Sequence, residues 1–485
     1  MRKRWLSFLL VCLCFFGVLP VLSACHKTVK AHSRYEITAE YVPQSGMLTG
    51  TVKVRFENHT DNEISVLKFQ LYANAYRETA LYQPVPASCK SAAYYGGESY
   101  GETSISSVNG AKNWEVMGED ENILYAYLVE SLFPGDEVVL DIAFTVKLAK
   151  VKHTVGVAPR SVNLGNFFPI LCGMKNGGFY ETVSCGIGEP YYTDCADITL
   201  HLKVPKDFVV CASGVESSVR TLESKKEHTM SLTNARDFAV TLSPSYRVEQ
   251  DEADGIALSY YHFGDKNAAK VMSLMKEAFA YFQKKFGAYP YENFTLAQTG
   301  LACSAPAFSA FGMLGDDWTE EKQVREIVQT IAMQWWGVTV GSDKVENAWQ
   351  AVGLSAYTAL TFFENYEKYG VTREAEVATS LKEYRSYYDV YGSVLGRTDT
   401  RMTRRLKDFI NEYEYQCLER DKAVVMFDTL RKSVGDREFF SGLKRYYADC
   451  RFERVLPADL VGAFERSGLD VVGFFDSFLE GKAVL

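Results

Sequence analysis

The sequence predicts a β-rich half followed by a helix-rich half, and three observations lead to this fold class. Short strand-like segments separated by turn residues occupy the first half of the chain. Near Gln250 the apolar spacing changes to the period of a helix. The length of 485 residues corresponds to about three domains at roughly 150 residues each. We place a β-rich domain at residues 35–248 and a mainly α-helical domain at residues 249–485.

The first 25 residues have the pattern of an export signal. Three basic residues at positions 2–4 precede an almost entirely apolar stretch, Trp5–Val21, and the chain then reads Leu-Ser-Ala-Cys at 22–25. This order is typical of a secretory leader, and the last four residues resemble the bacterial lipobox, whose cysteine is lipidated. We expect residues 1–24 to be removed, Cys25 to carry the lipid and residues 25–34 to form a tether. An uncleaved membrane anchor with a coincidental cysteine is the alternative.

Charge and hydropathy restrict the partners. A lipidated Cys25 would hold the body to the outer face of the bacterial cytoplasmic membrane or the cell envelope. No later segment has 18 uninterrupted apolar residues, so we expect no second span. The formal net charge is −9, which argues against nucleic acid as the main partner. With 47% hydrophobic and 23% charged residues, the composition excludes wholesale disorder.

The predicted β-rich domain contains seven strand-like segments. Turn residues such as those at 134–136 separate them, and this spacing favours an antiparallel sandwich or saddle. Residues 88–118 are rich in Gly, Ser and Tyr, so we interpret them as a loop or hairpin excursion. The predicted strands are Tyr35–Tyr41, Leu48–Glu57, Val66–Tyr72, Leu124–Val129, Glu137–Leu148, Ile198–Val204 and Phe238–Leu242.

The second half carries helical patterns. Apolar residues recur at helical spacing over Asp265–Phe286, and Gly287 ends that segment. From Glu320 onward the pattern is almost continuously helical, with clear cases at Arg373–Tyr388 and Asp421–Val434. We therefore expect the second domain to be built mainly from helices.

Eight cysteines lie beyond the leader and the lipidation site. None of them forms a C-x-x-C pair, so zinc-ribbon or thioredoxin chemistry is unsupported. An exported protein is permitted disulfides, and buried free thiols are the equal alternative. The eight are Cys89, Cys172, Cys185, Cys195, Cys211, Cys303, Cys417 and Cys450.

Several segments, in order and spacing, resemble one family. They are Gly188–Tyr192, Phe286–Tyr291, Gln334–Gly337, Trp349 and the C-terminal run Phe439–Phe478. Together they resemble the gluzincin aminopeptidases of the membrane alanyl aminopeptidase type. The resemblance implies a β-saddle domain, then a thermolysin-like, mainly helical domain with a small sheet. It also implies a zinc cofactor and removal of amino acids from the amino end of peptides.

The family's zinc-binding residues are replaced in this sequence. Its signature, H-E-x-x-H followed by a glutamate after eighteen residues, places two histidines on one helix face and a general base between them. The resemblance aligns Gln329 and Met333 with the histidines, Thr330 with the base and Val352 with the third ligand. No histidine follows His262, so no shift of register restores the motif. Taken without the resemblance, Gln329 and Met333 are simply the core face of a helix.

Two further positions of the family's site also differ. The family's glutamate that holds the free amino end aligns with Ala307, inside Ser304–Phe308. The tyrosine that stabilises the oxyanion aligns with Arg420, although Tyr413 and Tyr415 lie close by in the sequence. A thioether and an alkyl group do not replace imidazole and carboxylate as zinc ligands. We therefore assign no catalytic residue, no metal ligand and no cofactor.

The sequence leaves two functions from different classes. The favoured one is a noncatalytic, membrane-anchored lipoprotein with an aminopeptidase-like fold, which binds peptides or a protein partner at the cell surface. The alternative is an active metallo-aminopeptidase or another hydrolase whose catalytic residues have been relocated. An open, titratable cleft keeps both functions possible, whereas a cleft filled by Met333 and Val352 argues against both.

Overall fold

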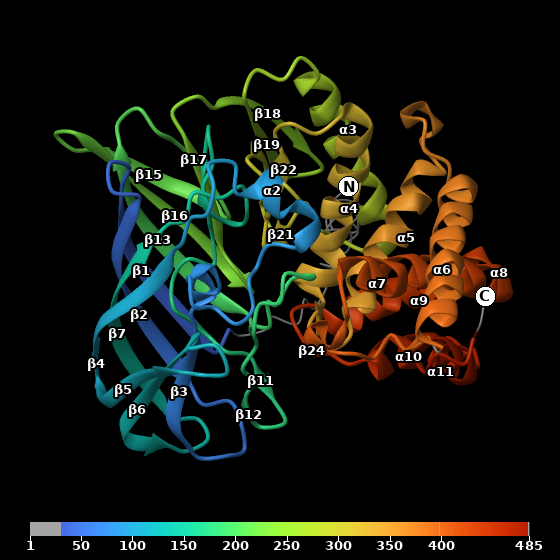
Figure 1. Cartoon of the computed structure of the whole chain (residues 1–485), viewed down its shortest axis with the longest axis horizontal. Helices are drawn as coiled ribbons and strands as arrows, with labels where there is room; N and C mark the ends of the chain where they lie inside the picture. Colours follow the sequence, from blue (N-terminus) through green and yellow to red (C-terminus); the bar gives the residue numbers. More distant parts are fainter. Residues whose placement is uncertain (1–30, 397, 484) are drawn as a thin grey trace, which may run out of the picture. The chain divides into compact units, whose positions relative to one another are not determined.

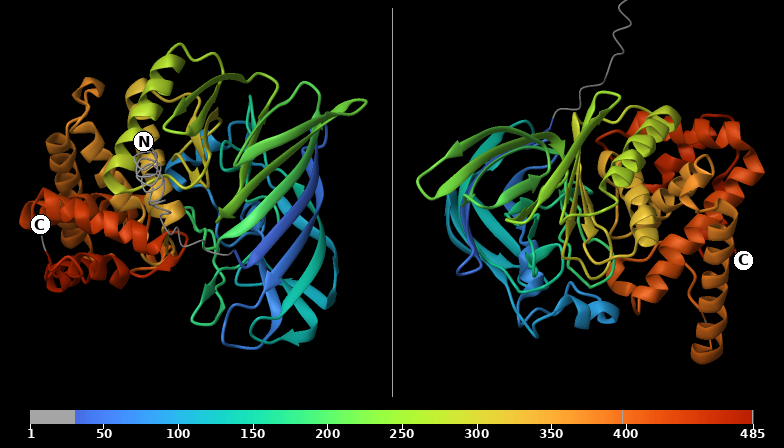
Figure 2. Two further views of the ribbon diagram at one scale, coloured as in Figure 1. Left: turned by 180° about the vertical axis from the view of Figure 1, so that it is seen from behind. Right: turned by 90° about the horizontal axis from the view of Figure 1, so that it is seen from above.

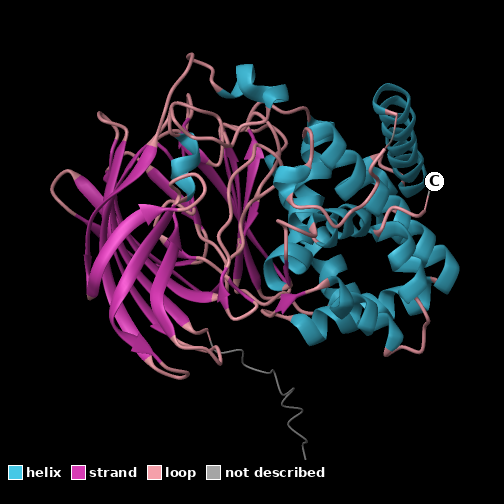
Figure 3. Ribbon diagram, turned by 60° about the horizontal axis from the view of Figure 1, so that its bottom comes forward, coloured by secondary structure: helices cyan, strands magenta, loops and turns pink. Residues whose placement is uncertain are grey.

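Strands occupy the first half of the chain and helices most of the second, as the sequence predicts (Figure 1 and Figure 3). The structure is a computed structural model that describes residues 31–485 apart from 397 and 484. The expected leader and Cys25 lie outside the described residues. The boundary near residue 248 stays a prediction.

The largest sheet has seven strands in the order β15-β16-β13-β1-β2-β7-β4. Every neighbouring pair is antiparallel except β1 and β13, which are parallel. In β1, Tyr35, Ile37, Ala39 and Tyr41 are buried, and the residues between them face outward. The strands are β1 (Ser33–Val42), β2 (Met47–Glu57), β4 (Glu102–Asn109), β7 (Glu137–Lys147), β13 (Ala196–Pro205), β15 (Val215–Thr221) and β16 (Lys225–Ala235).

Two four-stranded sheets and a short hairpin, formed by β11 and β12, complete the first half. One sheet has the order β10-β3-β6-β5 and the other β14-β17-β9-β8. The specific sandwich or saddle arrangement stays a prediction. The strands are β3 (Ile64–Gln70), β5 (Ala111–Met117), β6 (Ile123–Leu132), β8 (Val155–Val157), β9 (Val162–Gly165), β10 (Ile170–Leu171), β11 (Met174–Lys175), β12 (Gly178–Phe179), β14 (Val209–Ala212) and β17 (Ala239–Ser243).

The loop-or-hairpin interpretation of residues 88–118 is wrong for much of the segment. It contains the short helix α2 (Lys90–Ala93) and the strands β4 and β5, which join different sheets instead of pairing with each other. Only Thr103 and Val108 of β4 are buried. An edge strand with so few buried side chains has little apolar alternation, which is why the sequence pattern missed it.

The helical half contains a five-stranded sheet of order β18-β19-β20-β22-β21. Helices α3 and α4 pack against it, and Figure 2 shows the remaining helices beyond them. Over the described part of the chain, no helix combines the length and hydropathy needed to cross a bilayer. The strands of the five-stranded sheet are β18 (Arg247–Ala253), β19 (Ile256–His262), β20 (Asn293–Thr299), β21 (Ala307–Phe308) and β22 (Phe311–Gly315). A separate two-stranded sheet pairs β23 (Gly341–Ser342) with β24 (Arg454–Val455).

The helices begin and end slightly differently from the sequence prediction. Helix α3 begins at Ala268 because Asp265 accepts a 2.8 Å hydrogen bond from the Asn267 backbone in a turn before it. Helix α6 continues to Leu395, and residues 416–422 form a π-helical turn before α8. The helices are α3 (Ala268–Phe286), α4 (Glu320–Met333), α5 (Val352–Phe363), α6 (Arg373–Leu395), α7 (Glu412–Tyr415), α8 (Ala423–Val434), α9 (Asp436–Cys450), α10 (Pro457–Glu465) and α11 (Val472–Leu479).

An aromatic cluster fixes the end of α4. Trp335, fully buried, packs against Phe279 and Phe282 of α3 and against Tyr289. Its indole Nε1 donates a 3.0 Å hydrogen bond to the carbonyl of Gly287. Buried aromatic side chains contribute large apolar areas and their polar atoms need partners. These contacts hold the end of α4 against α3 and the loop that follows it.

Helix α5 approaches α8 so closely that only glycine fits at one point. A Cβ at Gly353 would lie 2.2 Å from the Cβ of Ala423 and 2.8 Å from the carbonyl oxygen of Glu419. We expect Gly353→Ala to lower the free energy of unfolding by about 1–3 kcal/mol through overpacking. Gly473 in α11 has no atom within 4 Å of such a Cβ, so Gly473→Ala is the control. Denaturant unfolding measures both, and equal stabilities of the two variants would contradict this account of the packing.

Candidate functional site

A cavity of about 590 Å³ lies where the β-rich half meets the helical half. One wall is formed by the exposed face of α4, the start of α5 and the π-helical turn 416–422. The other wall comes from residues 84–86, His153 and 186–189 of the β-rich half. This volume is within the usual range of ligand pockets. We call this cavity the cleft.

Four of the six positions singled out in the sequence line the cleft. Gln329 and Met333 lie one turn apart on α4, and Val352 is the first residue of α5; all three line the cavity. Arg420, from the π-helical turn, lines it as well. Single π-turns within helices are frequent at functional sites. The spacing taken from the family therefore brings these positions together in space.

Two other positions do not reach the cleft. Thr330 is 4% exposed and faces Gly312 of β22, where a Cβ would lie 2.6 Å from the Thr330 Cγ2 atom. Ala307 is buried and packs with Met333, Ala351 and Val352 in a small apolar cluster. Ala307 and Ala351 lie behind Met333 and Val352, which line the cleft.

The three side chains that the resemblance aligns with the family's zinc ligands do not fit that metal. Zinc in proteins takes thiolate, imidazole or carboxylate ligands. Gln329 offers an amide, Met333 a thioether and Val352 an alkyl group, and the Met333 sulfur already accepts a 3.4 Å hydrogen bond from the Ser355 hydroxyl. Across residues 31–485, leaving out 397 and 484, no three His, Cys, Asp or Glu side chains are grouped for a metal ion.

The helical wall of the cleft carries charged groups. Burial raises the pKa of the Glu326 carboxyl, and the nearby Lys322 and Arg420 partly offset that rise. Arg420 forms a 2.7 Å ion pair with Asp421, whose pKa burial also raises. The Ser380 hydroxyl donates a 2.9 Å hydrogen bond to Asp421. Sequence reasoning missed Glu326, although it lies one helical turn before Gln329 on the same face.

The β-rich wall carries two polar groups that the sequence analysis did not single out. The Nδ1 atom of His153 lies 2.5 Å from the Tyr76 hydroxyl, and burial lowers the pKa of His153 to about 4. Glu189 accepts a 2.6 Å hydrogen bond from the ammonium group of Lys344, a residue only 4% exposed. His153 and Glu189 come from loops far apart in sequence, so no local motif identifies them.

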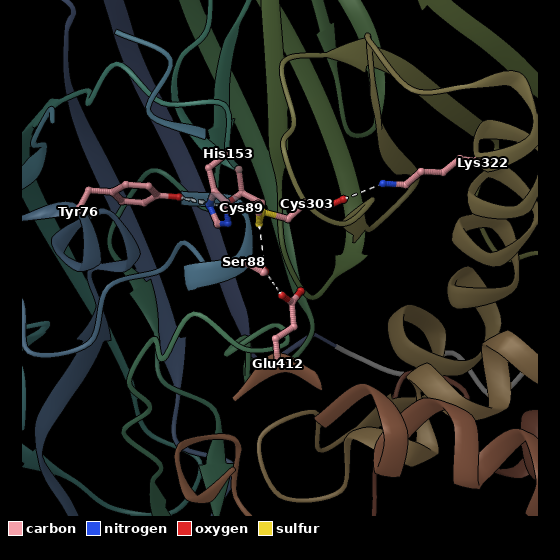
Figure 4. The surroundings of a disulfide bond; sticks show 8 residues. Tyr76, Ser88, Cys89, His153, Cys303, Lys322 and Glu412 are labelled. Carbon is pink, nitrogen blue, oxygen red and sulfur yellow. Dashed lines mark hydrogen bonds between the residues drawn. A yellow bond between two sulfur atoms is a disulfide. The ribbon is translucent and has the colours of Figure 1, made fainter. Parts of the chain in front are cut away.

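A disulfide closes one edge of the cleft (Figure 4). Cys89 of the β-rich half is bonded to Cys303, and the Cys303 carbonyl accepts a 3.3 Å hydrogen bond from the Lys322 ammonium group. Beside it, the Ser88 hydroxyl donates to the Glu412 carboxylate. The sequence left open both disulfides and free thiols, and both occur among the described residues. The free cysteines there are Cys172, Cys185, Cys195, Cys211, Cys417 and Cys450.

The two tyrosines considered beside Arg420 have different surroundings. Tyr415 is buried and contributes to the cleft lining next to Gly188. Tyr413 is 43% exposed and lies outside the cleft, on a neighbouring apolar groove. Of Tyr413, Tyr415 and Arg420, Arg420 is the residue that brings a positive charge to the cleft.

Solved structures share this fold. No protein-family model matches the sequence, and no curated protein shows detectable similarity to it. The M1 zinc metallopeptidase from Deinococcus radiodurans superposes with a TM-score of 0.62 at 15% identity, covering 94% of each chain. A mutant of it bound to a Tyr-Ser-Ala substrate gives 0.63 at 16% identity, again covering 94% of each chain. A two-domain M1 mutant bound to L-tryptophan gives 0.63 at 15% identity, covering 94% of this chain and 96% of that one.

These likenesses show the fold of the chain. Its β-rich first half and helical second half, together, have the architecture of the M1 zinc metallopeptidases, as the sequence resemblance implies. The chain is thus a protein of the aminopeptidase-like fold class. At this level of identity, activity has to be argued from the residues of the site itself.

The convergence of the aligned positions predicts that a zinc site can be rebuilt. We expect the triple variant Gln329→His, Met333→His, Val352→Glu to hold about one zinc ion per chain, because two imidazoles and a carboxylate would then face one point. Elemental mass spectrometry after dialysis measures the content. The double variant with Val352 unchanged is the control and should bind at least tenfold more weakly. A folded triple variant without zinc would show that the alignment is wrong.

Proposed function

We propose that this chain is a noncatalytic binding protein that holds peptides, or a peptide segment of a protein partner, in its cleft. The observation that carries the proposal is the open cavity of about 590 Å³ at the aligned zinc position, lined by Gln329, Met333 and Val352. A fold that keeps the cavity but replaces the metal ligands retains a place for a ligand without the means to cleave it.

The type of ligand is inferred from the structural neighbours. One neighbour is a mutant bound to a Tyr-Ser-Ala substrate, and another holds L-tryptophan. In this chain the cleft has hydrogen-bonding and charged groups on both walls, including His153 and Glu189 on one side and Glu326 and Arg420 on the other. Peptides offer both backbone polar groups and side chains to such walls.

Peptide hydrolysis lacks its usual agents at this site. Without zinc, nothing in the aligned position lowers the pKa of water from near 15.7 toward about 7. Thr330 has no carboxylate to act as a base, and its side chain is turned toward β22. The competing function, hydrolysis by relocated groups, is favoured only by the raised pKa values of Glu326 and Asp421 in the cleft.

We further propose that the protein acts outside the cytoplasm, held by a lipid on Cys25. The sequence pattern at 22–25 supports this location. The Cys89–Cys303 disulfide gives independent support, because disulfides persist mainly in oxidising compartments. The partners are then the membrane, through the anchor, and a peptide or protein ligand at the cell surface.

Binding without turnover is the testable outcome of the proposed function. We expect the tripeptide Tyr-Ser-Ala to bind in calorimetry and to be recovered intact by mass spectrometry. Gln329→Trp should weaken binding at least tenfold, because the larger ring would occupy the cavity that Gln329 lines. Lys382→Trp, on the exposed side of α6, is the matched control. Steady release of tyrosine by the unchanged chain would contradict the proposal and favour the hydrolase.

The anchor has its own test. We expect Cys25→Ala to move the protein from the membrane pellet to the soluble or secreted fraction, because the lipid could no longer be attached. Metabolic labelling with a fatty-acid analogue and cell fractionation measure this change. Cys185→Ala, which removes a free cysteine of the folded body, is the control. Label on the Cys25→Ala variant would exclude the proposed lipidation site.

A further inference from the structure

A small recess opens from the cleft into the β-rich half. Its volume is about 50 Å³, and it shares His153, Glu189 and Ser304 with the cleft. The buried rings of Tyr72 and Tyr191 contribute to its walls. The recess is large enough for a water molecule or a small planar group.

The hydroxyl groups around His153 Nδ1 favour one tautomer of the ring. The Tyr76 hydroxyl oxygen accepts from the backbone N–H of Val155 at 3.3 Å, so its own proton points elsewhere. His153 Nδ1 lies 2.5 Å from this hydroxyl and 3.1 Å from the Thr154 hydroxyl, so two O–H groups are placed to donate to it. Burial raises the pKa of Tyr76 and lowers that of His153, so both groups stay neutral near pH 7. A neutral imidazole that accepts at Nδ1 carries its proton on Nε2.

The other nitrogen of His153 is left as an unused donor. No described residue forms a hydrogen bond with Nε2, and the ring lines both the cleft and the recess. In Figure 4 the ring lies between Tyr76 and the disulfide. Because Tyr76 holds the opposite nitrogen, the N–H of Nε2 is fixed in direction before any ligand arrives.

Glu189 presents an acceptor to the same recess. Its Oε2 atom is bonded to the Lys344 ammonium group, and that ion pair balances the charge of the carboxylate. Its Oε1 atom has no hydrogen-bond partner among the described residues. Glu189 borders the recess together with His153. The recess therefore has one free donor and one free acceptor on separate side chains.

We propose that this recess binds one planar amide group of the ligand. The carbonyl oxygen of the amide accepts from His153 Nε2–H, and its N–H donates to Glu189 Oε1. A carboxylate would meet the carboxylate of Glu189, and an ammonium group would offer no acceptor to His153. An amide alone of these three satisfies both side chains. This inference rests on the proposed peptide function and names the part of the peptide that is recognised.

The tautomer is tested without any ligand. In the full chain labelled with ¹⁵N-histidine, we expect the nitrogen shifts of His153 to show a protonated Nε2 and an unprotonated Nδ1 at pH 7. The His153→Phe variant assigns the signals by their loss. A proton on Nδ1 would overturn the inference, since Nε2 would then be an acceptor facing an acceptor.

The amide contact is tested with variants and a modified peptide. We expect His153→Phe to weaken binding of Tyr-Ser-Ala about fivefold, as loss of one hydrogen bond predicts, while His153→Gln, which keeps a donor, restores much of the affinity. His59→Phe, at an exposed site outside the cleft, should change nothing. Replacing the recognised peptide N–H by an ester oxygen in the ligand should cost a similar factor and avoids altering Glu189, whose partner Lys344 is buried.

The possible outcomes separate the two proposals. Tyr-Ser-Ala has two peptide bonds and therefore two ester analogues. If His153→Phe and both ester analogues leave the affinity unchanged, the amide subsite alone is overturned and the recess holds only water. Failure of the unchanged chain to bind the tripeptide would overturn the peptide function, and the subsite with it. Weakening by His153→Phe but by neither ester would assign His153 a contact and remove the role of Glu189.

Discussion

A buried arginine joins the β-rich half of the chain to the helical half, and the cleft lies between these halves. Arg236, 5% exposed, donates to the carbonyl of Val338 at 2.8 Å, to that of Glu453 at 2.8 Å and to that of Thr193 at 3.4 Å. Arginine presents several donors in a rigid plane, which suits such a cluster of carbonyl groups. Gly341 permits the approach, since a Cβ there would lie 2.3 Å from the guanidinium carbon. Removing the arginine would take its donors from the carbonyls of the buried residues Val338 and Thr193, which is costly, whereas the Glu453 carbonyl would still accept from the Gly341 N–H.

This junction gives the cleft two walls of different character. The helical wall, with Glu326 and Arg420, carries charge, whereas the β-rich wall carries His153, held by Tyr76, and Glu189, paired with Lys344. The disulfide and the Ser88–Glu412 hydrogen bond join the walls at one edge. A ligand between them would meet groups already positioned by the fold, which lowers the entropic cost of binding.

The sequence predicted some of this site and not the rest, for physical reasons. Gln329, Met333 and Val352 were found because the resemblance to the aminopeptidase family relates them by a fixed spacing, and they do meet in the cleft. His153 was not found, because its role depends on Tyr76, a contact between residues distant in sequence. In the fold, the polar edge strand β4 was missed because Thr103 and Val108 alone are buried in it. Local sequence patterns indicate single helices and strands, whereas the two walls of the cleft form only when segments distant in sequence pack together.

The metal content of the purified protein, measured together with aminopeptidase activity before and after addition of zinc, tests the central claim most directly. The account predicts no stoichiometric zinc and no turnover in either condition, because an amide, a thioether and an alkyl group occupy the aligned position. About one tightly bound zinc ion per chain with zinc-dependent release of amino acids would contradict it. That result would mean that other residues hold the metal and that the chain is an enzyme.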